Sequence, residues 1–177
     1  MYEIAALFID TLQFGWDVFS SLPETDQDPL VTVRVHGGYG IPDGSKFSDD
    51  ANISNAGIRI FRNNGSQRYG FEVNRFYVND PEISLSENDS FDAYGLVLEQ
   101  KLGSGLIASF GVMGYSGYDN SHSTPVGTMF NLGWEPKFGR NSQFQPYIAY
   151  RNDAICGEDT DMIQSLSIGF TWNSSPL

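Results

Sequence analysis

From Pro29 onward, apolar and polar residues alternate one by one, and clusters of Asn, Asp, Gly, Ser and Pro interrupt the alternation at intervals. Successive side chains of a β-strand point to opposite sides, so an alternation of period two predicts strands with one apolar and one polar face. We identify eight candidate strands. In the last of them, Leu166, Ile168 and Phe170 alternate with small polar residues, and the strand ends just before the C-terminus. The pattern predicts an all-β domain.

The third candidate strand is less regular than the others. Phe71 and Val73 fall on one face of an ideal strand, whereas Phe76 and Val78 fall on the other. One extra residue in the strand, a β-bulge, would bring the four apolar side chains to the same face. We therefore expect a bulge near Asn74.

The candidate connections alternate in length along the chain. Ile41 to Asn55 is long and Asn63 to Ser66 is short, and the alternation continues through the short Gly139 to Ser142 to the long Asp153 to Asp161. Barrels of the outer membrane have short turns on the periplasmic side and longer loops outside, whereas Greek-key sandwiches mix both lengths at each end. The sequence predicts an eight-stranded antiparallel up-and-down transmembrane β-barrel with both ends of the chain on the periplasmic side.

Composition excludes several other classes of protein. No run approaches 18 apolar residues, so a transmembrane helix is excluded, and a closed barrel is the other structure that can span a bilayer. The net charge of -12, with 10 Lys and Arg against 22 Asp and Glu, excludes nucleic-acid binding. The single cysteine, Cys156, cannot form an internal disulfide and has no neighbouring Cys or His. We expect neither a metal site nor a cofactor.

The N-terminal segment is ambiguous, and we divide the chain into a segment and linker at 1–28 and a barrel at 29–177. Thr11 to Phe19 alternates like a strand, but Ile4, Leu7 and Leu12 also approximate one helical stripe. A ninth strand would leave the two chain ends on opposite sides of the membrane. We favour a short helix at the membrane interface and keep the strand as the alternative.

The polar faces of the strands distinguish a membrane barrel from a soluble one. Soluble strands cover this face with Lys, Glu and Thr, whereas here it is rich in Gly, Ser and Asn with isolated charges of both signs. Inside a narrow barrel such charges must pair, because an unpaired buried ion costs several kcal/mol. We predict a polar network in the lumen made of Arg34, His36, Arg59, Glu72, Glu99, Glu135 and Arg151. A soluble ligand-binding barrel is the alternative.

The strand rhythm, the phrase Phe144 to Tyr150 and the closing Ser167 to Trp172 resemble small outer-membrane barrels. The similar families are the outer-membrane protein A and X type and the lipid A-modifying barrels. The resemblance implies a bacterial outer-membrane location, with membrane lipid and lipopolysaccharide as partners. We expect a monomer, and functions in these families range from structural tethering to adhesion and enzymology.

Two enzymatic hypotheses follow from the resemblance. The lipid A palmitoyltransferase family uses a His, an Asp and a Ser near the outer leaflet, and His36, Asp89 and Ser90 are candidates for these roles. The stretch Ser54 to Ile58 is similar to the His-x-Ser-Asn-Ala-Gly motif of lipid A 3-O-deacylases, but Asn52 stands where that motif has its histidine. A serine nucleophile needs an adjacent base, and asparagine cannot accept a proton.

The other histidine, His122, falls in a long loop, where we expect a solvated side chain. We favour a non-enzymatic barrel with a role in envelope structure or surface interaction. A lipid A acyltransferase-like or deacylase-like enzyme is the alternative.

Overall fold

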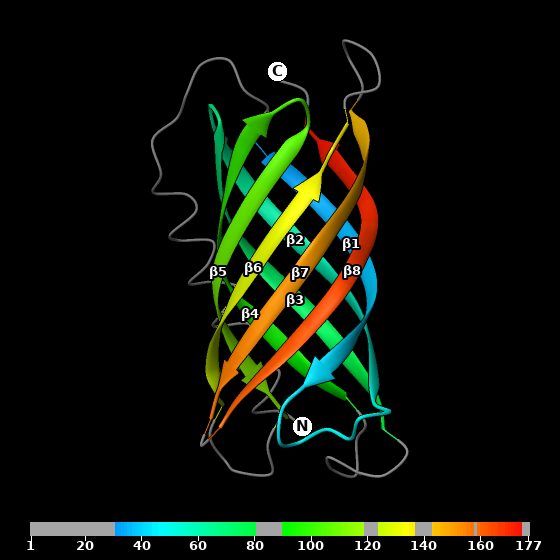
Figure 1. Ribbon diagram of the computed structural model, residues 1–177. Helices are drawn as coiled ribbons and strands as arrows, with labels where there is room; N and C mark the ends of the chain where they lie inside the picture. Colours follow the sequence, from blue (N-terminus) through cyan, green and yellow to red (C-terminus); the bar gives the residue numbers. More distant parts are fainter. Residues whose placement is uncertain (1–30, 81–89, 119–123, 137–142, 158, 175–177) are drawn as a thin grey trace.

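The computed structural model describes residues 31–80, 90–118, 124–136, 143–157 and 159–174. Eight antiparallel strands follow one another around a closed barrel, and the last strand pairs with the first (Figure 1). The predicted all-β, up-and-down barrel is therefore confirmed. The strands are β1 (Val31–Asp43), β2 (Asn52–Asn64), β3 (Gln67–Asn79), β4 (Ser90–Gly103), β5 (Leu106–Ser116), β6 (Val126–Trp134), β7 (Phe144–Cys156) and β8 (Thr160–Asn173).

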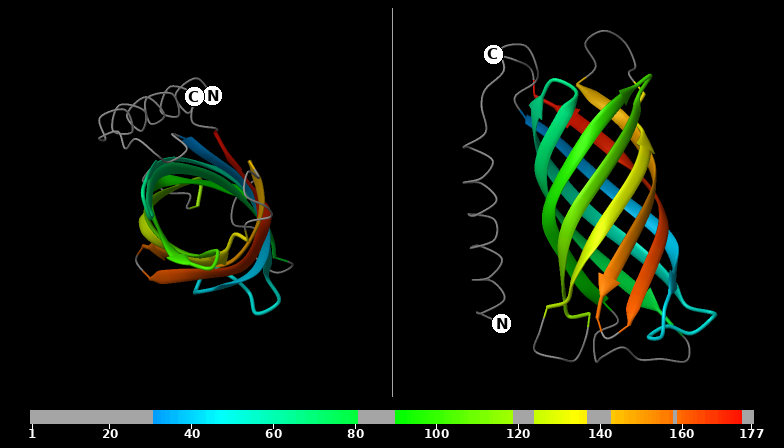
Figure 2. Two further views of the ribbon diagram at one scale, coloured as in Figure 1. Left: turned by 90° about the horizontal axis from the view of Figure 1, so that it is seen from above. Right: turned by 60° about the vertical axis from the view of Figure 1, so that its left-hand side comes forward.

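Closure leaves no open edge among the strands. Val33 of β1 lies opposite Ile60 of β2 on one side and Trp172 of β8 on the other. The pairing of β1 with β8 runs from Thr32 to Asp43, and the view along the barrel shows the complete ring (Figure 2). We call the end where β1 begins and β8 ends the terminal end, and the opposite end the loop end.

The connections depart from strict alternation in two places. Residues 135–143 join β6 to β7 at the terminal end and form a longer connection than predicted, whereas residues 157–159 join β7 to β8 at the loop end and form a short one. The prediction of a long connection from Asp153 to Asp161 is wrong. Asp153 resembled a turn residue, but its carboxylate is buried against the guanidinium of Arg151, so β7 continues beyond it.

The bulge expected near Asn74 is also wrong. The registers of β3 with β2 and with β4 run without a shift past this residue. Phe76 and Val78 are buried and share the inward face with Glu72 and Asn74. The change of face has a simple cause: toward the loop end, the inside of the barrel is itself apolar.

The outward faces of the strands are apolar and exposed. In β8, Leu166, Ile168 and Phe170 are 57%, 64% and 67% exposed. The distribution of apolar side chains is therefore the reverse of that in a soluble protein, in which side chains of this kind fill the core. Outward residues of the other strands follow the same rule, including Val35, Tyr39, Ile58, Leu96, Leu98, Phe110, Val112, Phe130, Leu132, Ile148 and Tyr150.

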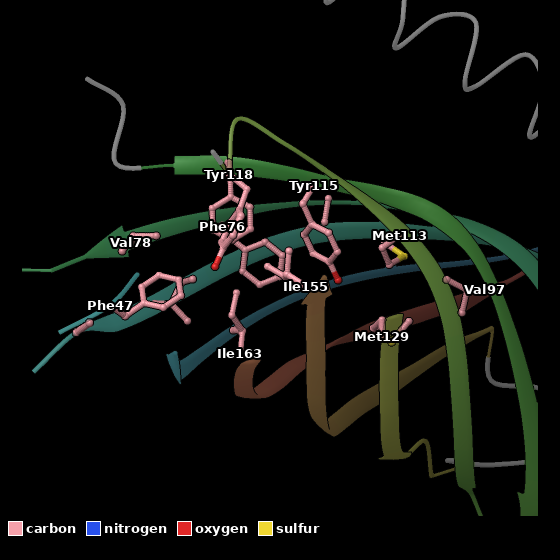
Figure 3. Close-up of a cluster of buried hydrophobic side chains, with 14 of the residues drawn as sticks. Phe47, Phe76, Val78, Val97, Met113, Tyr115, Tyr118, Met129, Ile155 and Ile163 are labelled. Carbon is pink, nitrogen blue, oxygen red and sulfur yellow. The ribbon is translucent and has the colours of Figure 1, made fainter. Parts of the chain in front are cut away.

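The inward faces divide the lumen into two halves. Near the loop end lies a cluster of apolar and aromatic side chains (Figure 3). Phe91 stacks on Phe76 at 4.8 Å between ring centroids and meets Tyr118 edge-on at 5.0 Å. The other half, toward the terminal end, is lined mainly by charged and polar side chains, with a small apolar cluster of Ile107, Tyr147 and Ala149. Among the described residues, no helix has the length and apolar character needed to cross a bilayer.

Candidate functional site

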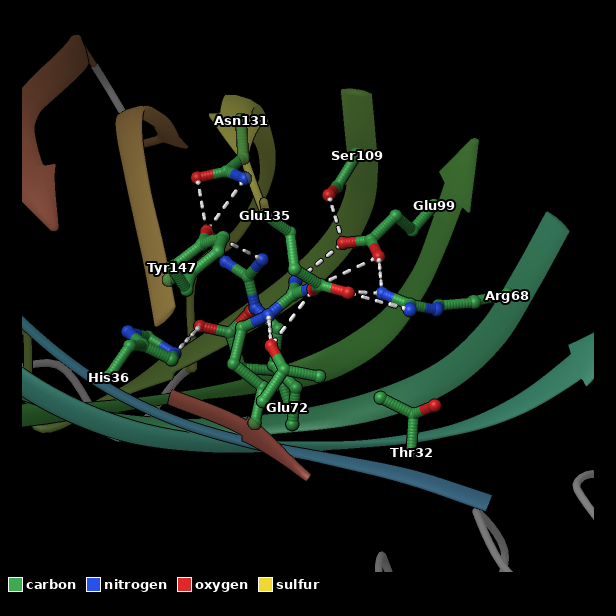
Figure 4. Close-up of polar contacts among 12 residues, drawn as sticks. Thr32, His36, Arg68, Glu72, Glu99, Ser109, Asn131, Glu135 and Tyr147 are labelled. Atoms are coloured by element: carbon green, nitrogen blue, oxygen red, sulfur yellow. Dashed lines mark hydrogen bonds and ion pairs between the residues drawn. The ribbon is translucent and has the colours of Figure 1, made fainter. Parts of the chain in front are cut away.

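Four charged side chains form the first ionic group in the lumen, which we call the terminal quartet: three come from β1, β3 and β4, and the fourth lies just beyond the end of β6. It consists of Arg34, Arg68, Glu99 and Glu135 (Figure 4). Arg34 contacts both carboxylates, with 2.5 Å from Nη1 to Oε2 of Glu99 and 2.5 Å from Nη2 to Oε2 of Glu135. Arg68 does the same at 2.7 and 2.8 Å. Two positive and two negative charges therefore balance in a buried ring.

Glu135 of this quartet lies one residue beyond the end of β6. Burial alone would raise the pKa of its carboxyl. The hydrogen bonds from Arg68, together with the charges of Arg34 and Arg68, more than offset burial, so the pKa of Glu135 lies below its ordinary value. The carboxylate therefore stays ionised opposite the two guanidinium groups.

A second group, the central quartet, lies farther toward the loop end and consists of Arg59, Arg151, Glu72 and Asp153. Arg59 Nε donates to Oε2 of Glu72 at 2.5 Å, and Arg151 contacts the other oxygen of the same carboxylate. Arg151 also donates from Nε to Asp153 at 2.6 Å. The charges balance here as well, and the hydroxyl of Tyr115 donates to Asp153 at 2.9 Å.

Tyr147 links the two quartets. The Arg34 guanidinium lies 4.2 Å from the centroid of its ring, and Arg59 Nη1 lies 3.5 Å from its hydroxyl. The amide of Asn131 hydrogen-bonds the same hydroxyl at 2.9 Å. Each guanidinium of the two quartets therefore has an aromatic or anionic neighbour.

All seven residues of the predicted lumen network lie on the inward face and are buried. Six of them belong to the two quartets. His36 differs, because its Nε2 lies 3.6 Å from Oε1 of Glu72 and neither ring nitrogen has a hydrogen-bond partner.

Sequence reasoning missed two members of the quartets, Arg68 and Asp153. Arg68 lies two residues after the turn at residues 65–66, and we had assigned Asp153 to a connection. The alternation of faces along each strand could have identified both residues. Arg68 is four residues from Glu72 and shares the inward face of β3 with it, and Asp153 is two residues from Arg151 and shares the inward face of β7 with it.

The candidate acyl-transfer residues do not meet. His36 lies beside Glu72, which is paired across the sheet with Gly95 of β4. Ser90 lies five residues farther along that strand, about 17 Å away at roughly 3.4 Å per residue. Asp89 and His122 lie outside the described residues.

The candidate deacylase serine faces outward. Ser54 is exposed on β2, while the imidazole of His36 is inside the barrel. Within the described ranges, no group of three His, Cys, Asp or Glu residues could hold a metal ion.

Residues 44–51 connect β1 to β2 at the loop end, and we call this segment the cap. Phe47 inserts into the apolar cluster, 6.2 Å from the ring of Tyr118. Ser48 donates to Asp80 from its backbone nitrogen at 2.9 Å and from its hydroxyl at 2.6 Å. Ser45 donates to Asp159 at 3.2 Å. These contacts tie the cap to residues near the ends of β3 and β7, so it offers a defined surface at this end.

The chain is similar to known proteins in its fold but not in its sequence. No family model and no curated protein matches its sequence. Among solved structures, Neisserial surface protein A (NspA) aligns with a TM-score of 0.62 and 14% identity over 84% of this chain and 99% of that one. Ail, the attachment invasion locus protein of Yersinia pestis, solved with the heparin analogue sucrose octasulfate, covers 80% of this chain and 96% of its own at 15% identity and a TM-score of 0.35. The similarity to NspA, a small eight-stranded outer-membrane barrel, supports the same fold here.

Proposed function

We propose that this chain is an integral protein of a bacterial outer membrane that acts without catalysis, in envelope structure or surface interaction. One observation carries the proposal: the apolar side chains of the strands face outward, and the charged ones face each other inside. A closed barrel with this distribution is stable in hydrocarbon, because every strand hydrogen bond is made within the ring. The same surface in water would be an apolar patch far larger than soluble monomers expose.

The interacting surface in this proposal is the loop end. The two quartets and the aromatic cluster fill the lumen from its middle to the loop end. A cavity of about 480 Å³, lined by Arg68, Glu135 and Gln145 among others, lies at the terminal end, which this proposal places on the periplasmic side. The cap, in contrast, presents an ordered surface, with Asp49 and Asp50 exposed on it. Short connections occur on the periplasmic side of such barrels. Two of the three connections at the terminal end, at residues 65–66 and 104–105, are short, whereas three of the four at the loop end are long and one, at residues 157–159, is short. The loop end would therefore face outside.

The native cysteine tests this location and orientation. Cys156 is exposed at the loop end of β7. A membrane-impermeant maleimide should label it on intact cells. A matched variant, Cys156→Ser with Ser104→Cys, moves the thiol to the terminal end and should be labelled only after the membrane is permeabilised. Equal labelling of both proteins on intact cells, or recovery of the protein in the soluble fraction, would overturn the proposal.

Lipopolysaccharide is the lipid partner that we propose. Arg75 on the outward face of β3 lies toward the loop end, and its side chain is 53% exposed beside Asp92. An arginine at the border of the apolar band is suited to a phosphate group, because its guanidinium can donate two parallel hydrogen bonds. We further propose that the protein acts as a monomer, which light scattering of the detergent complex can test.

Purified lipopolysaccharide should raise the unfolding midpoint of the refolded protein more than phosphatidylethanolamine does. Arg75→Gln should reduce that difference several-fold. Lys101→Gln at the terminal end is the matched control and should leave it unchanged. If lipopolysaccharide raises the unfolding midpoint of Arg75→Gln as much as that of the unchanged protein, Arg75 does not bind a lipopolysaccharide phosphate.

A further inference from the structure

The cavity at the terminal end takes no part in the surface interaction proposed above, and we call it the terminal cavity. Its wall comes from β3, β4, β5, β7 and the residues just beyond β6, together with the turn at residues 104–105. Gly103, Ser104 and Leu106 are exposed, so the cavity reaches the rim of the barrel. Its volume of about 480 Å³ lies within the range of about 300–1,000 Å³ that is common for small-molecule sites.

Gln145 is a buried polar residue in the wall of the terminal cavity. It is 8% exposed and lies on the inward face of β7. Its side-chain amide makes no hydrogen bond to any residue that the structure describes. Such an amide has one acceptor oxygen and two donor hydrogens, and a buried group without partners costs free energy. The amide of Gln145 is therefore available to donate to a molecule in the cavity and to accept from it.

Arg68 brings a further donor to the same wall (Figure 4). A guanidinium group has five N–H donors. Nε donates to Asn63 at 3.0 Å, Nη1 donates to Glu99 at 2.7 Å and to Glu135 at 3.1 Å, and Nη2 donates to Glu135 at 2.8 Å. These bonds use four of the five hydrogens. One hydrogen of Nη2 therefore has no acceptor among the described residues.

The charges in the wall favour an anion as the ligand. Arg68 and Lys101 are the cations that line the cavity, and Glu135 is the acid. Both oxygens of Glu135 already accept hydrogen bonds: Oε1 accepts from Arg68, and Oε2 accepts from Arg34 and from Thr171. The wall therefore has a net charge of one positive unit, and its carboxylate is already satisfied. A carboxylate on a ligand can accept charge-assisted hydrogen bonds from such a wall.

The remaining side chains of the wall are apolar. Ile107 is buried, and Leu106 and Pro136 lie beside the same cavity. A ligand that matches all three features has a carboxylate for the cations, an amide group that exchanges hydrogen bonds with Gln145, and an apolar side chain. We propose that the terminal cavity binds a small N-acyl amino acid or short peptide with a free carboxylate and an apolar side chain.

Titration of the isotope-labelled, refolded protein in detergent micelles with N-acetyl-leucine tests the proposal and does not depend on orientation in the membrane. We expect saturable shifts of the NMR signals of the Gln145 side-chain amide and the Ile107 methyl groups. N-acetyl-leucinamide has the same shape without the charge and should bind about ten-fold more weakly. N-acetylglycine, which lacks the apolar side chain, should also bind more weakly. The absence of saturable shifts, or equal binding of the three compounds or of inorganic phosphate, would overturn the proposal.

Variants of the wall locate the binding site, with the Ile107 methyl signals as the measurement. Gln145→Ala should weaken the binding of N-acetyl-leucine several-fold. Lys101→Gln should weaken the binding of N-acetyl-leucine but leave that of N-acetyl-leucinamide unchanged, because only the former is charged. Gln164→Ala, at an exposed glutamine on the outer face of β8, is the matched control and should bind like the unchanged protein. If folded Gln145→Ala and Lys101→Gln both bind N-acetyl-leucine as tightly as the control, the terminal cavity is not the site.

Discussion

Glu72 shows most clearly what a single residue does in this barrel. It is fully buried, and its two oxygens contact Arg59 and Arg151. Replacing a buried ion pair by well-packed apolar groups can be neutral, whereas removing one partner leaves an uncompensated charge in a medium of low dielectric constant. The quartets therefore make the barrel sensitive to any change that alters the charge of a single member.

We expect Glu72→Gln to lower the free energy of unfolding by about 3–5 kcal/mol, because Arg59 then loses its ion pair with this carboxylate and Arg151 retains the one with Asp153. Urea unfolding of the refolded protein in lipid vesicles, followed by tryptophan fluorescence, measures the change. The exposed pair of Arg75 and Asp92 provides the control: Asp92→Asn should cost less than about 1 kcal/mol. Equal effects of the two variants would contradict the importance of burial.

The sequence indicates which side chains enter the lumen better than it indicates which of them meet. Arg34 and Glu99 were expected inside because they stand on the polar face of their strands. Their mutual contact joins β1 to β4 across the barrel, and this depends on the diameter and stagger of the closed sheet rather than on any local pattern.

At the scale of the strand, alternation predicted β8 well and β3 poorly. In β8 every outward residue from Leu166 to Trp172 is apolar and every inward one is small or polar. In β3 the same rule fails at Phe76, because an apolar residue can face lipid or the aromatic cluster in the lumen. Hydrophobicity alone does not distinguish these two environments. The end of β7 was predicted too early because Asp153 is buried only through its ion pair with Arg151, which the alternation pattern does not reveal.

Depth in the bilayer should determine the cost of a charge on β8. Ile168→Arg places a guanidinium in the middle of the apolar band and should lower stability by about 2–4 kcal/mol, whereas Thr160→Arg at the strand end should cost about 0–1 kcal/mol. Equilibrium unfolding in vesicles measures both. Similar costs at the two positions would show that the outward face of β8 does not contact hydrocarbon.

Packing between β3 and β4 inside the loop-end half gives a third prediction. Phe91→Ala removes the ring that stacks on Phe76 and meets Tyr118, and should cost about 3–5 kcal/mol. The temperature at which the folded, fast-migrating form disappears on a denaturing gel should fall accordingly. Tyr77→Ala, which changes an exposed ring on the outer surface, is the control and should have a smaller effect.

For the molecule as a whole, the filled lumen has a measurable consequence. The quartets and the aromatic cluster separate the cavity at the terminal end from the loop end, so we expect no conductance steps when the refolded protein is added to a planar lipid bilayer. An eight-stranded barrel has an interior that side chains can fill. Regular single-channel openings from protein that is fully folded on a gel would show that the interior opens.

The pairing of β1 with β8 governs how such a chain can be made. Until the final strand has been synthesised, β1 offers a row of backbone groups with nothing to bind, and a bilayer supplies no substitute. A nascent chain stopped before Thr160 would therefore be left as an open sheet liable to aggregate. Closure has to wait until β8 has been synthesised, and a cell that makes this protein needs a way to hold the unfolded strands until the ring can be sealed.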